Sequence, residues 1–190
     1  IIVYDTFWFG DFIKEHEYLK KIKGDVRDIE KLSSIEDDID SVIHLACISN
    51  DNTFELNPKL SEEINYNSFL PLISFFKKRG VKRFINASSS SVYGFSDNPD
   101  VTEEHPLLPL TLYNKFKGLC EPILFEHHSN NFTCVNVRPA TICGCSPRMR
   151  FDLSVNILTN LATRKKEVIV FGGKQMRPNL HINDMCNFYE

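Results

Sequence analysis

Tyr113 and Lys117 could together act as an acid–base pair. They lie four positions apart in a segment with helical periodicity, so a helix would place them on one face, about one turn apart. A free phenol has a pKa of about 10 and is a poor base at neutral pH, but a nearby ammonium group favours the phenolate. Such a pair could take a proton from an alcohol hydroxyl. An exposed helix with a half-buried tyrosine would show the same spacing.

A run of serines precedes this pair. Ser88–Ser91 continues into Val92-Tyr93-Gly94, directly after an apolar segment that we predict to be a strand. Pro106 and Pro109 follow, and then Tyr113 and Lys117. The order strand, serine run, proline loop and helix would bring a hydroxyl group to the helix that carries the phenol and the ammonium group.

The elements that must position these residues alternate along the chain. We predict strands at Ile1–Tyr4, Lys21–Gly24, Ser41–Ala46, Lys82–Ala87, Thr133–Val137 and Glu167–Phe171. We predict helices at Pro58–Arg79, Thr111–His128 and Asp152–Thr163, a final helical stretch near Phe188, and a polar loop after Ala46. Strands separated by crossover helices predict an α/β fold, with a doubly wound parallel sheet and helices on both faces. Ligands of such sheets bind at the carboxyl ends of the strands.

Composition and charge exclude several classes of protein. The chain has 190 residues, 42% hydrophobic and 25% charged, which is typical of a globular protein and not of a disordered one. A net charge of −3 and a pI near 6.1 argue against nucleic acid as a partner. No apolar run approaches the roughly 18 residues of a membrane span, so no membrane partner is expected.

The six cysteines do not have the spacing of a metal site. No C-x-x-C pair is present, and Cys143-Gly144-Cys145 is too tight for the usual zinc spacing. We therefore expect buried thiols in a reducing cytoplasm, and no metal.

With these segments in order, the sequence resembles the extended short-chain dehydrogenase/reductase family, the NAD-dependent nucleotide-sugar epimerases and dehydratases. That family has S-S-x-x-V-Y-G, E-x-x-P-x-x-P and Y-x-x-x-K in sequence, and here Glu103 or Glu104 precedes the prolines. Further similar segments are Gly24–Asp28, His44–Cys47, Asn65–Asn67, Arg138–Thr141 and Gly172–Asp184. The resemblance implies a Rossmann-type fold and an enzyme that uses NAD.

The resemblance also implies roles for individual residues. The catalytic residues would be Ser89, Tyr113 and Lys117. The cofactor would be contacted by Asp5, Asp25, Val26, Leu45, Ala46, Cys47, Asn65, Ala87, Tyr113, Lys117 and Pro139. The nucleotide-sugar substrate would be contacted by Ser90, Thr141, Arg150, Asn156 and Arg177. The arginines suit a diphosphate because the guanidinium group binds phosphate oxygens bidentately.

Two of these assignments have a plain structural alternative. An acid at Asp5 favours NAD over NADP, because it accepts from the ribose 2′-hydroxyl and repels a 2′-phosphate, but it could also cap a turn. Arg150 could equally be a surface-loop residue.

Ser90 and Ser91 bear on the type of reaction. They stand where 4,6-dehydratases of the family have Asp and Glu, and a hydroxyl group cannot replace those carboxyl groups in expelling water. We therefore expect a 4-epimerase, which oxidises and reduces one sugar carbon through a keto intermediate. The alternatives are an NAD(P)-dependent sugar reductase, dehydrogenase or dehydratase of the same family, and a non-catalytic Rossmann-like binding module. The sequence does not identify the sugar.

The motif order also predicts the domain organisation. Residues 1–145 would form the NAD-binding domain, without the first strand and glycine-rich loop of the family, and residues 146–190 part of the substrate-binding region. The chain is therefore expected to be a fragment of a longer protein. The resemblance also implies a homodimer that pairs through Pro58–Arg79 and Thr111–His128. Pro122 removes one backbone donor from its helix, so we expect a kink beyond the turn that carries Tyr113 and Lys117.

Overall fold

The computed structural model describes residues 1–190, and the chain divides into two compact units. The first unit is Ile1–Arg138 and the second is Pro139–Glu190. Each unit has its own parallel strands and helices, and we describe each by itself.

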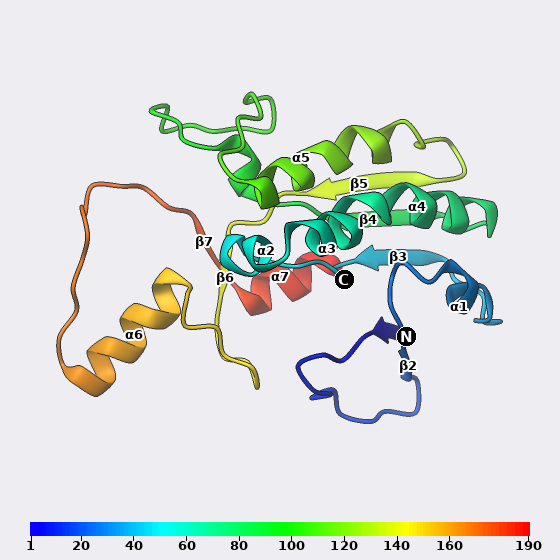
Figure 1. The fold of residues 1–190 in the computed structure, drawn as a ribbon, viewed down its shortest axis with the longest axis horizontal. Coiled ribbons are helices and arrows are strands. Elements are labelled where there is room, and N and C mark those ends of the chain that lie inside the picture. Colours follow the sequence, from blue (N-terminus) through cyan, green and yellow to red (C-terminus); the bar gives the residue numbers. More distant parts are fainter. The chain divides into compact units, whose positions relative to one another are not determined.

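All the strands of the first unit pair in parallel, as the sequence predicts. Strands β1 (Ile2–Asp5) and β2 (Lys20–Lys23) form one ladder. Strands β3 (Ser41–His44), β4 (Arg83–Ala87) and β5 (Thr133–Val137) form a second sheet in that order. Because β3, β4 and β5 run the same way, their carboxyl ends meet at one edge (Figure 1).

The helices of the first unit connect these strands. They are α1 (Ile29–Ser33), α2 (Asp51–Leu56), α3 (Pro58–Glu62), the π-helix η1 (Glu63–Asn67), α4 (Phe69–Lys78), the 3₁₀ turn η2 (Ser90–Tyr93) and α5 (Leu112–Phe125). After α4 the chain turns at Gly80, whose φ of +84° is a left-handed conformation that favours glycine. Helix α5 begins at Thr111, whose side chain accepts a hydrogen bond from the backbone N–H of Asn114.

One hydrophobic core holds α4 and α5 against the sheet. In β4, Phe84 and Asn86 are buried and alternate with less buried residues, which is the pattern of a strand with one well-covered face. The buried cluster comprises Leu32, Ile35, Phe69, Leu72, Ile73, Phe76, Val81, Phe84, Cys120, Leu124, Phe132 and Cys134. Ile2, Tyr4 and Ile22 pack against this cluster, so β1 and β2 share the same core.

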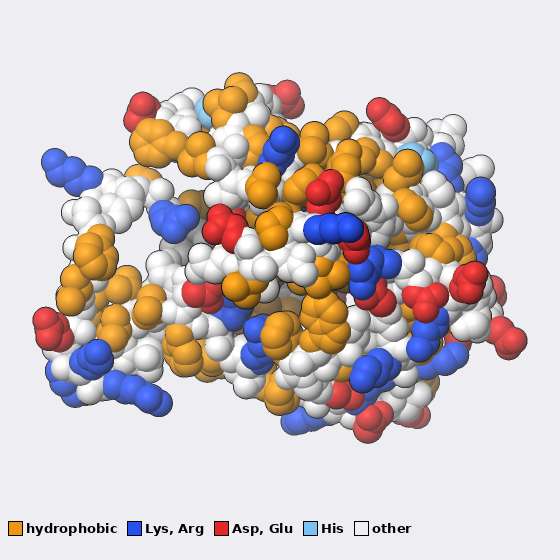
Figure 2. All heavy atoms as spheres, viewed as in Figure 1, with side chains coloured by type: hydrophobic (Ala, Val, Ile, Leu, Met, Phe, Trp, Pro, Cys, Tyr) orange, Lys and Arg blue, Asp and Glu red, His pale blue; other side chains and the backbone are white.

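Some apolar side chains of α4 and α5 remain exposed. They include Leu70, Leu112 and Leu119. Figure 2 shows hydrophobic side chains gathered over α5.

Three features of the first unit differ from the sequence prediction. The helical stretch at 58–79 is present, but the π-helix η1 interrupts it, which the periodicity does not reveal. The loop expected after β3 contains the short helix α2. Helix α5 continues through Pro122 to Phe125, and the turn that carries Tyr113 and Lys117 is intact, as expected.

The second unit has two strands and two helices. Strands β6 (Thr141–Cys143) and β7 (Asn179–His181) pair in parallel, and helices α6 (Ser154–Lys165) and α7 (Ile182–Tyr189) accompany them. The strand predicted at Glu167–Phe171 is wrong. That segment forms no ladder, and Ile169, Val170 and Phe171 are exposed, because β6 pairs with β7 instead.

The cysteines are only partly as predicted. Cys120 and Cys134 are buried, whereas Cys145 and Cys186 are exposed, so the expectation of buried thiols is wrong for the last two. None of the six is in a disulfide bond. Burial raises the pKa of the Cys120 thiol to about 12, which makes it unreactive. No helix is long and apolar enough to cross a membrane.

Replacing Phe84 tests the importance of this core. Phe84 is fully buried and contacts the rings of Phe69, Phe76 and Phe132. Phe84→Ala should lower the free energy of unfolding by about 3–5 kcal/mol in chemical denaturation, because it leaves a cavity. The matched control is Phe95→Ala, where the ring is 73% exposed and the change should be within about 0.5 kcal/mol. Equal effects of the two substitutions would contradict this assignment of the core.

Candidate active site

Lys117 is fixed where α5 passes the carboxyl end of β4. The residue is only 7% exposed, and its Nζ donates a 2.6 Å hydrogen bond to the carbonyl of Ala87, the last residue of β4. The same Nζ lies 6.0 Å from the centre of the Tyr113 ring. The structure therefore brings together the phenol and the ammonium group, as the spacing predicts.

Ser89 lies just beyond Ala87, at the start of η2. Its Oγ accepts from the backbone N–H of Ser91 at 3.2 Å and donates to the Ser91 hydroxyl at 3.0 Å. The turn is tight because Gly94, at φ +69°, passes the backbone of Leu108, and a Cβ at Gly94 would lie 2.0 Å from the Leu108 carbonyl oxygen. The serine turn, which is Ser89–Gly94, is thus packed against the loop that leads into α5.

Asn65 holds the loop that follows β3. Its Oδ1 accepts from the backbone N–H of Ile48 at 2.8 Å, and its Nδ2 donates to the Ile48 carbonyl at 3.0 Å. Asn65 lies in the π-helix η1, and its own carbonyl accepts a hydrogen bond from the Cys120 thiol at 3.3 Å. The segment Leu45–Cys47, predicted to line the cofactor, is therefore anchored directly after its last residue.

One carboxylate ends β1 and another lies two residues after β2. Asp5 accepts from the backbone N–H of Phe7 at 2.6 Å, so it does cap a turn, the alternative that the sequence leaves open. Asp25 accepts from Nε and Nη2 of Arg27 at 3.0 and 2.8 Å, and these hydrogen bonds lower the pKa of Asp25. Gly24 is required between them, because a Cβ there would lie 2.2 Å from the Tyr4 ring.

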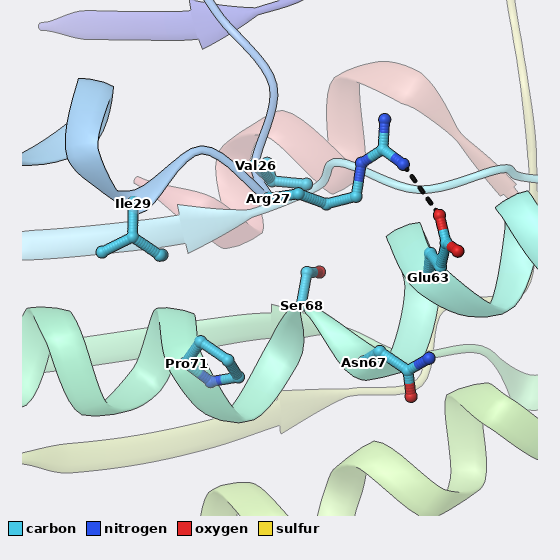
Figure 3. Close-up of a pocket in the computed structure, with 7 residues that line it drawn as sticks. All are labelled: Val26, Arg27, Ile29, Glu63, Asn67, Ser68 and Pro71. Atoms are coloured by element: carbon cyan, nitrogen blue, oxygen red, sulfur yellow. Dashed lines mark hydrogen bonds and ion pairs between the residues drawn. The ribbon is translucent and has the colours of Figure 1, made fainter.

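A cavity of about 230 Å³ lies beside Val26. It is lined by Val26, Arg27, Ile29, Glu63, Asn67, Ser68 and Pro71. Figure 3 shows the Arg27 guanidinium group reaching toward Glu63, and their ion pair measures 3.1 Å. The cavity is thus mostly apolar beside Val26 and Ile29, with one charged pair.

In the second unit, Asn156 and Arg150 are linked. Asn156 is buried, its Nδ2 donates to the Arg150 carbonyl at 3.0 Å, and its Oδ1 accepts from the Gly144 N–H at 3.5 Å. The Arg150 guanidinium pairs with Asp152 through bonds of 3.1 and 2.7 Å. Thr141 begins β6, and Arg177 is exposed before β7.

Comparisons with known proteins identify the family. The profile described as "NAD dependent epimerase/dehydratase family" matches residues 10–189. The chain belongs to the NAD dependent epimerase/dehydratase family. The resemblance noted from the motifs is therefore confirmed.

Individual relatives agree with this family. A UDP-glucuronate 4-epimerase of Thermodesulfobacterium geofontis is 28% identical over 95% of this chain and 56% of its own length. An undecaprenol-linked N-acetylglucosaminyl diphosphate 4-epimerase of Escherichia coli O157:H7 is 33% identical over 87% of this chain and 49% of its own. The chain thus spans about half the length of these relatives.

Solved structures share the fold. The UDP-N-acetylglucosamine 4-epimerase of Methanobrevibacter ruminantium M1 matches with a TM-score of 0.84 and 25% identity, over 98% of this chain and 62% of that one. A dTDP-glucose 4,6-dehydratase of Streptomyces venezuelae, solved with NAD, matches with a TM-score of 0.83 and 21% identity over 98% and 60%. The Rossmann-type fold expected from the motifs is confirmed.

Sequence reasoning missed one group of residues in this family member. Glu121, Arg138, Tyr93 and Ser88 form a hydrogen-bonded network behind the serine turn. Glu121 follows Lys117 by four residues, so its place on the same buried helix face was the available signal. Its partner Arg138 directly follows β5 and lies 17 residues away in the sequence, so no local pattern reveals the pairing.

His44 gives the first unit a pH-dependent stability. It is buried between the rings of Phe69 and Phe84, and burial, with the positive charge of Lys117 second, lowers its pKa from 6.5 to about 3. Between these values the unfolded chain binds a proton that the folded chain does not, so stability falls as pH falls.

Removing the imidazole should flatten this dependence. The free energy of unfolding falls between pH 6.5 and about pH 4.5. This fall should be roughly 2–3 kcal/mol smaller in His44→Gln than in the unsubstituted protein. Urea denaturation at several pH values measures this, with the exposed His16→Gln as control. Parallel pH curves for His44→Gln and the unsubstituted protein would refute the buried neutral imidazole.

Proposed function

We propose that this protein is an NAD-dependent nucleotide-sugar 4-epimerase. The observation that carries the proposal is the buried Lys117, held on the Ala87 carbonyl with its Nζ 6.0 Å from the Tyr113 ring centre, beside the serine turn. A buried cation near a phenol favours the phenolate, which is the base that removal of a hydroxyl proton requires.

The residues present fit a dinucleotide. Asp5 and Asp25 offer carboxylate oxygens to hydroxyl and amino donors, at the ends of two paired parallel strands. Val26 borders a cavity for an apolar ring face, and small side chains at Ala46 and Ala87 let a ligand approach the backbone. We assign the ribose to Asp5, the adenine to Asp25 and Val26, and the remaining contacts to Leu45, Cys47, Asn65 and Pro139. Bound NAD supplies the hydride acceptor and donor for the reaction.

The chain's own residues handle the proton. Tyr113 is the phenolate, which the Lys117 ammonium group stabilises, and its oxygen takes the proton of the sugar C4 hydroxyl. Ser89 shares the hydrogen bond between the sugar oxygen and Tyr113. When the sugar is reduced on its opposite face, Tyr113 returns the proton to the same oxygen, so the enzyme ends with the protonation state in which it began.

The serine turn favours epimerisation over loss of water. Ser90 and Ser91 carry no carboxyl group, and the Ser91 hydroxyl already accepts from Ser89. No acid–base pair is therefore available from these positions to expel a second hydroxyl group at neutral pH.

A nucleotide sugar is the substrate class that suits the second unit. We assign its diphosphate to Arg150 and Arg177, and its sugar to Ser90, Thr141 and Asn156. The bond between Asn156 and the Arg150 carbonyl would fix the backbone of one phosphate ligand. The relative from Thermodesulfobacterium geofontis is named as a 4-epimerase of a UDP-sugar, which supports this class. The Escherichia coli relative is named for a sugar diphosphate linked to undecaprenol, so it supports the diphosphate and not the nucleotide. On this assignment residues 1–145 bind the cofactor and residues 146–190 contribute to the substrate site.

We also propose that the protein is a homodimer. Helices α4 and α5 expose Leu70, Leu112 and Leu119, and the last two are one heptad apart on α5. Exposed leucines at heptad spacing suit packing against the same helices of a second copy.

Replacing Tyr113 tests the catalytic assignment. Tyr113→Phe, made in the protein expressed from its complete coding sequence, should lower kcat by at least about 100-fold, because the proton acceptor is lost. Binding of NADH, followed by fluorescence, should be retained. Tyr18→Phe, at a 71% exposed ring, is the control. A Tyr113→Phe enzyme with an unchanged rate of interconversion of UDP-sugars would refute the role of Tyr113.

Replacing Leu119 tests the dimer. Leu119→Glu should shift the protein from dimer to monomer in analytical ultracentrifugation, because it places a charge in an apolar interface. Leu56→Glu, on the short helix α2, should leave the dimer intact. A monomeric unsubstituted protein, or a dimer that Leu119→Glu leaves unchanged, would contradict the proposed interface.

A further inference from the structure

Glu121 is a buried carboxylate that the proposed reaction does not use. It is only 2% exposed and lies on α5 one turn beyond Lys117. A charge in the core is unfavourable unless it is paired and hydrogen-bonded, so its partners must explain its presence.

Both carboxylate oxygens of Glu121 are occupied. Oε1 accepts from the Ser88 hydroxyl at 2.5 Å and from Arg138 Nε at 3.0 Å. Oε2 accepts from Arg138 Nη2 at 2.6 Å and from Nε at 3.2 Å. Glu121 thus joins the end of β4 to the residue that follows β5.

Arg138 extends the same network to the serine turn. Its Nη1 donates to the Tyr93 hydroxyl at 2.8 Å and to the Glu103 carbonyl at 3.0 Å. One guanidinium group therefore holds α5, η2 and the loop before α5 together. Its hydrogen bonds to Glu121 raise the pKa of Arg138, so the charge persists at any physiological pH.

Lys117 and Glu121 bind two consecutive residues, the last residue of β4 and the residue that follows it. Lys117 binds the carbonyl of Ala87, and Glu121 binds the side chain of Ser88. The next residue is Ser89. Two side chains one turn apart on α5 therefore fix the backbone directly before the serine turn, while Arg138 fixes Tyr93 at its other end.

We propose that Glu121, through Ser88 and Arg138, is the positioning residue that sets Ser89 against the helix that carries Tyr113 and Lys117. The Glu121 carboxylate accepts hydrogen bonds from Ser88 and Arg138, and we infer that it acts on Ser89 through these two partners. The effect of Glu121 on kcat rests on the proposed function, whereas its effect on the mobility of residues 89–94 does not. A shift of about 1 Å in a catalytic group can lower a rate about 100-fold, so loss of this clamp should reduce kcat strongly.

Two variants distinguish the positioning of Ser89 by Glu121 from a general effect of Glu121 on the stability of the fold. Glu121→Gln leaves Arg138 without its charged partner and can fail to fold. Ser88→Ala removes the hydrogen bond from the Ser88 hydroxyl to Glu121 and keeps the ion pair between Glu121 and Arg138. Glu126→Gln, at an exposed glutamate just after α5, removes the same charge as Glu121→Gln and is the control.

The experiment measures hydrogen exchange and kinetics on the protein expressed from its complete coding sequence. In Ser88→Ala, exchange at the amides of residues 89–94 should become at least about tenfold faster, with exchange in β4 and α4 unchanged. The kcat for UDP-sugar epimerisation should fall about 10- to 100-fold, with KM for the sugar nearly unchanged. Ser88→Thr, which keeps the hydroxyl group, should restore both, and Glu126→Gln should change neither.

The outcomes test the positioning role of Glu121 and the proposed epimerase activity separately. Exchange at 89–94 that stays unchanged in Ser88→Ala overturns the positioning role, whatever the activity. Faster exchange with an unchanged kcat also overturns it, because the serine turn would then move without effect on catalysis. If the unsubstituted protein epimerises no UDP-sugar, the proposed function fails, and the exchange measurement alone decides whether Glu121 holds the serine turn.

Discussion

The hydrogen bond between Lys117 Nζ and the carbonyl of Ala87 is the interaction on which the rest of the candidate site depends. It joins the turn of α5 that carries Tyr113 and Lys117 to the carboxyl end of β4, at 2.6 Å and largely out of solvent. Thr111 caps the start of α5, and the hydrophobic core packs this helix against the sheet. Ser89 lies two residues after Ala87, whose carbonyl binds Lys117.

A second junction accompanies the first. The network of Glu121, Arg138, Ser88 and Tyr93 places a buried ion pair beside the serine turn. Hydrophobic packing alone would hold α5 on the sheet but would not fix the direction of a hydroxyl group. Directional bonds at the last residue of β4, Ala87, and at the next residue, Ser88, supply that fixed geometry, and a proton transfer needs it.

Much of the fold could be predicted from the sequence, because its signals are local. Strand β5 matches the predicted Thr133–Val137 to the residue, and α5 begins one residue after the expected Thr111. The segment Glu167–Phe171 shows the limit of such signals. Its apolar run has the composition of a strand, but a strand also needs a partner for its backbone, and no composition reveals that partner.

The candidate site likewise contains residues that local spacing predicts and residues that depend on tertiary packing. Tyr113 and Lys117 share one helix, so their spacing was sufficient to place them together. The pairing of Asn65 with Ile48 and of Glu121 with Arg138 joins segments 17 residues apart in each case, and it depends on how helices pack on the sheet. The π-helix at Glu63–Asn67 is equally a consequence of packing, and it leaves no mark in the periodicity.

A deuterium label at the sugar C4 distinguishes 4-epimerisation from the other reactions. UDP-sugars deuterated at C4 would be incubated with the protein and NAD in ordinary water, and the products followed by NMR. A 4-epimerase that removes and returns hydride at one carbon should convert the sugar to its C4 epimer with the deuterium retained at C4. Loss of the label to solvent, or a product that has lost water, would show that the protein is not a 4-epimerase.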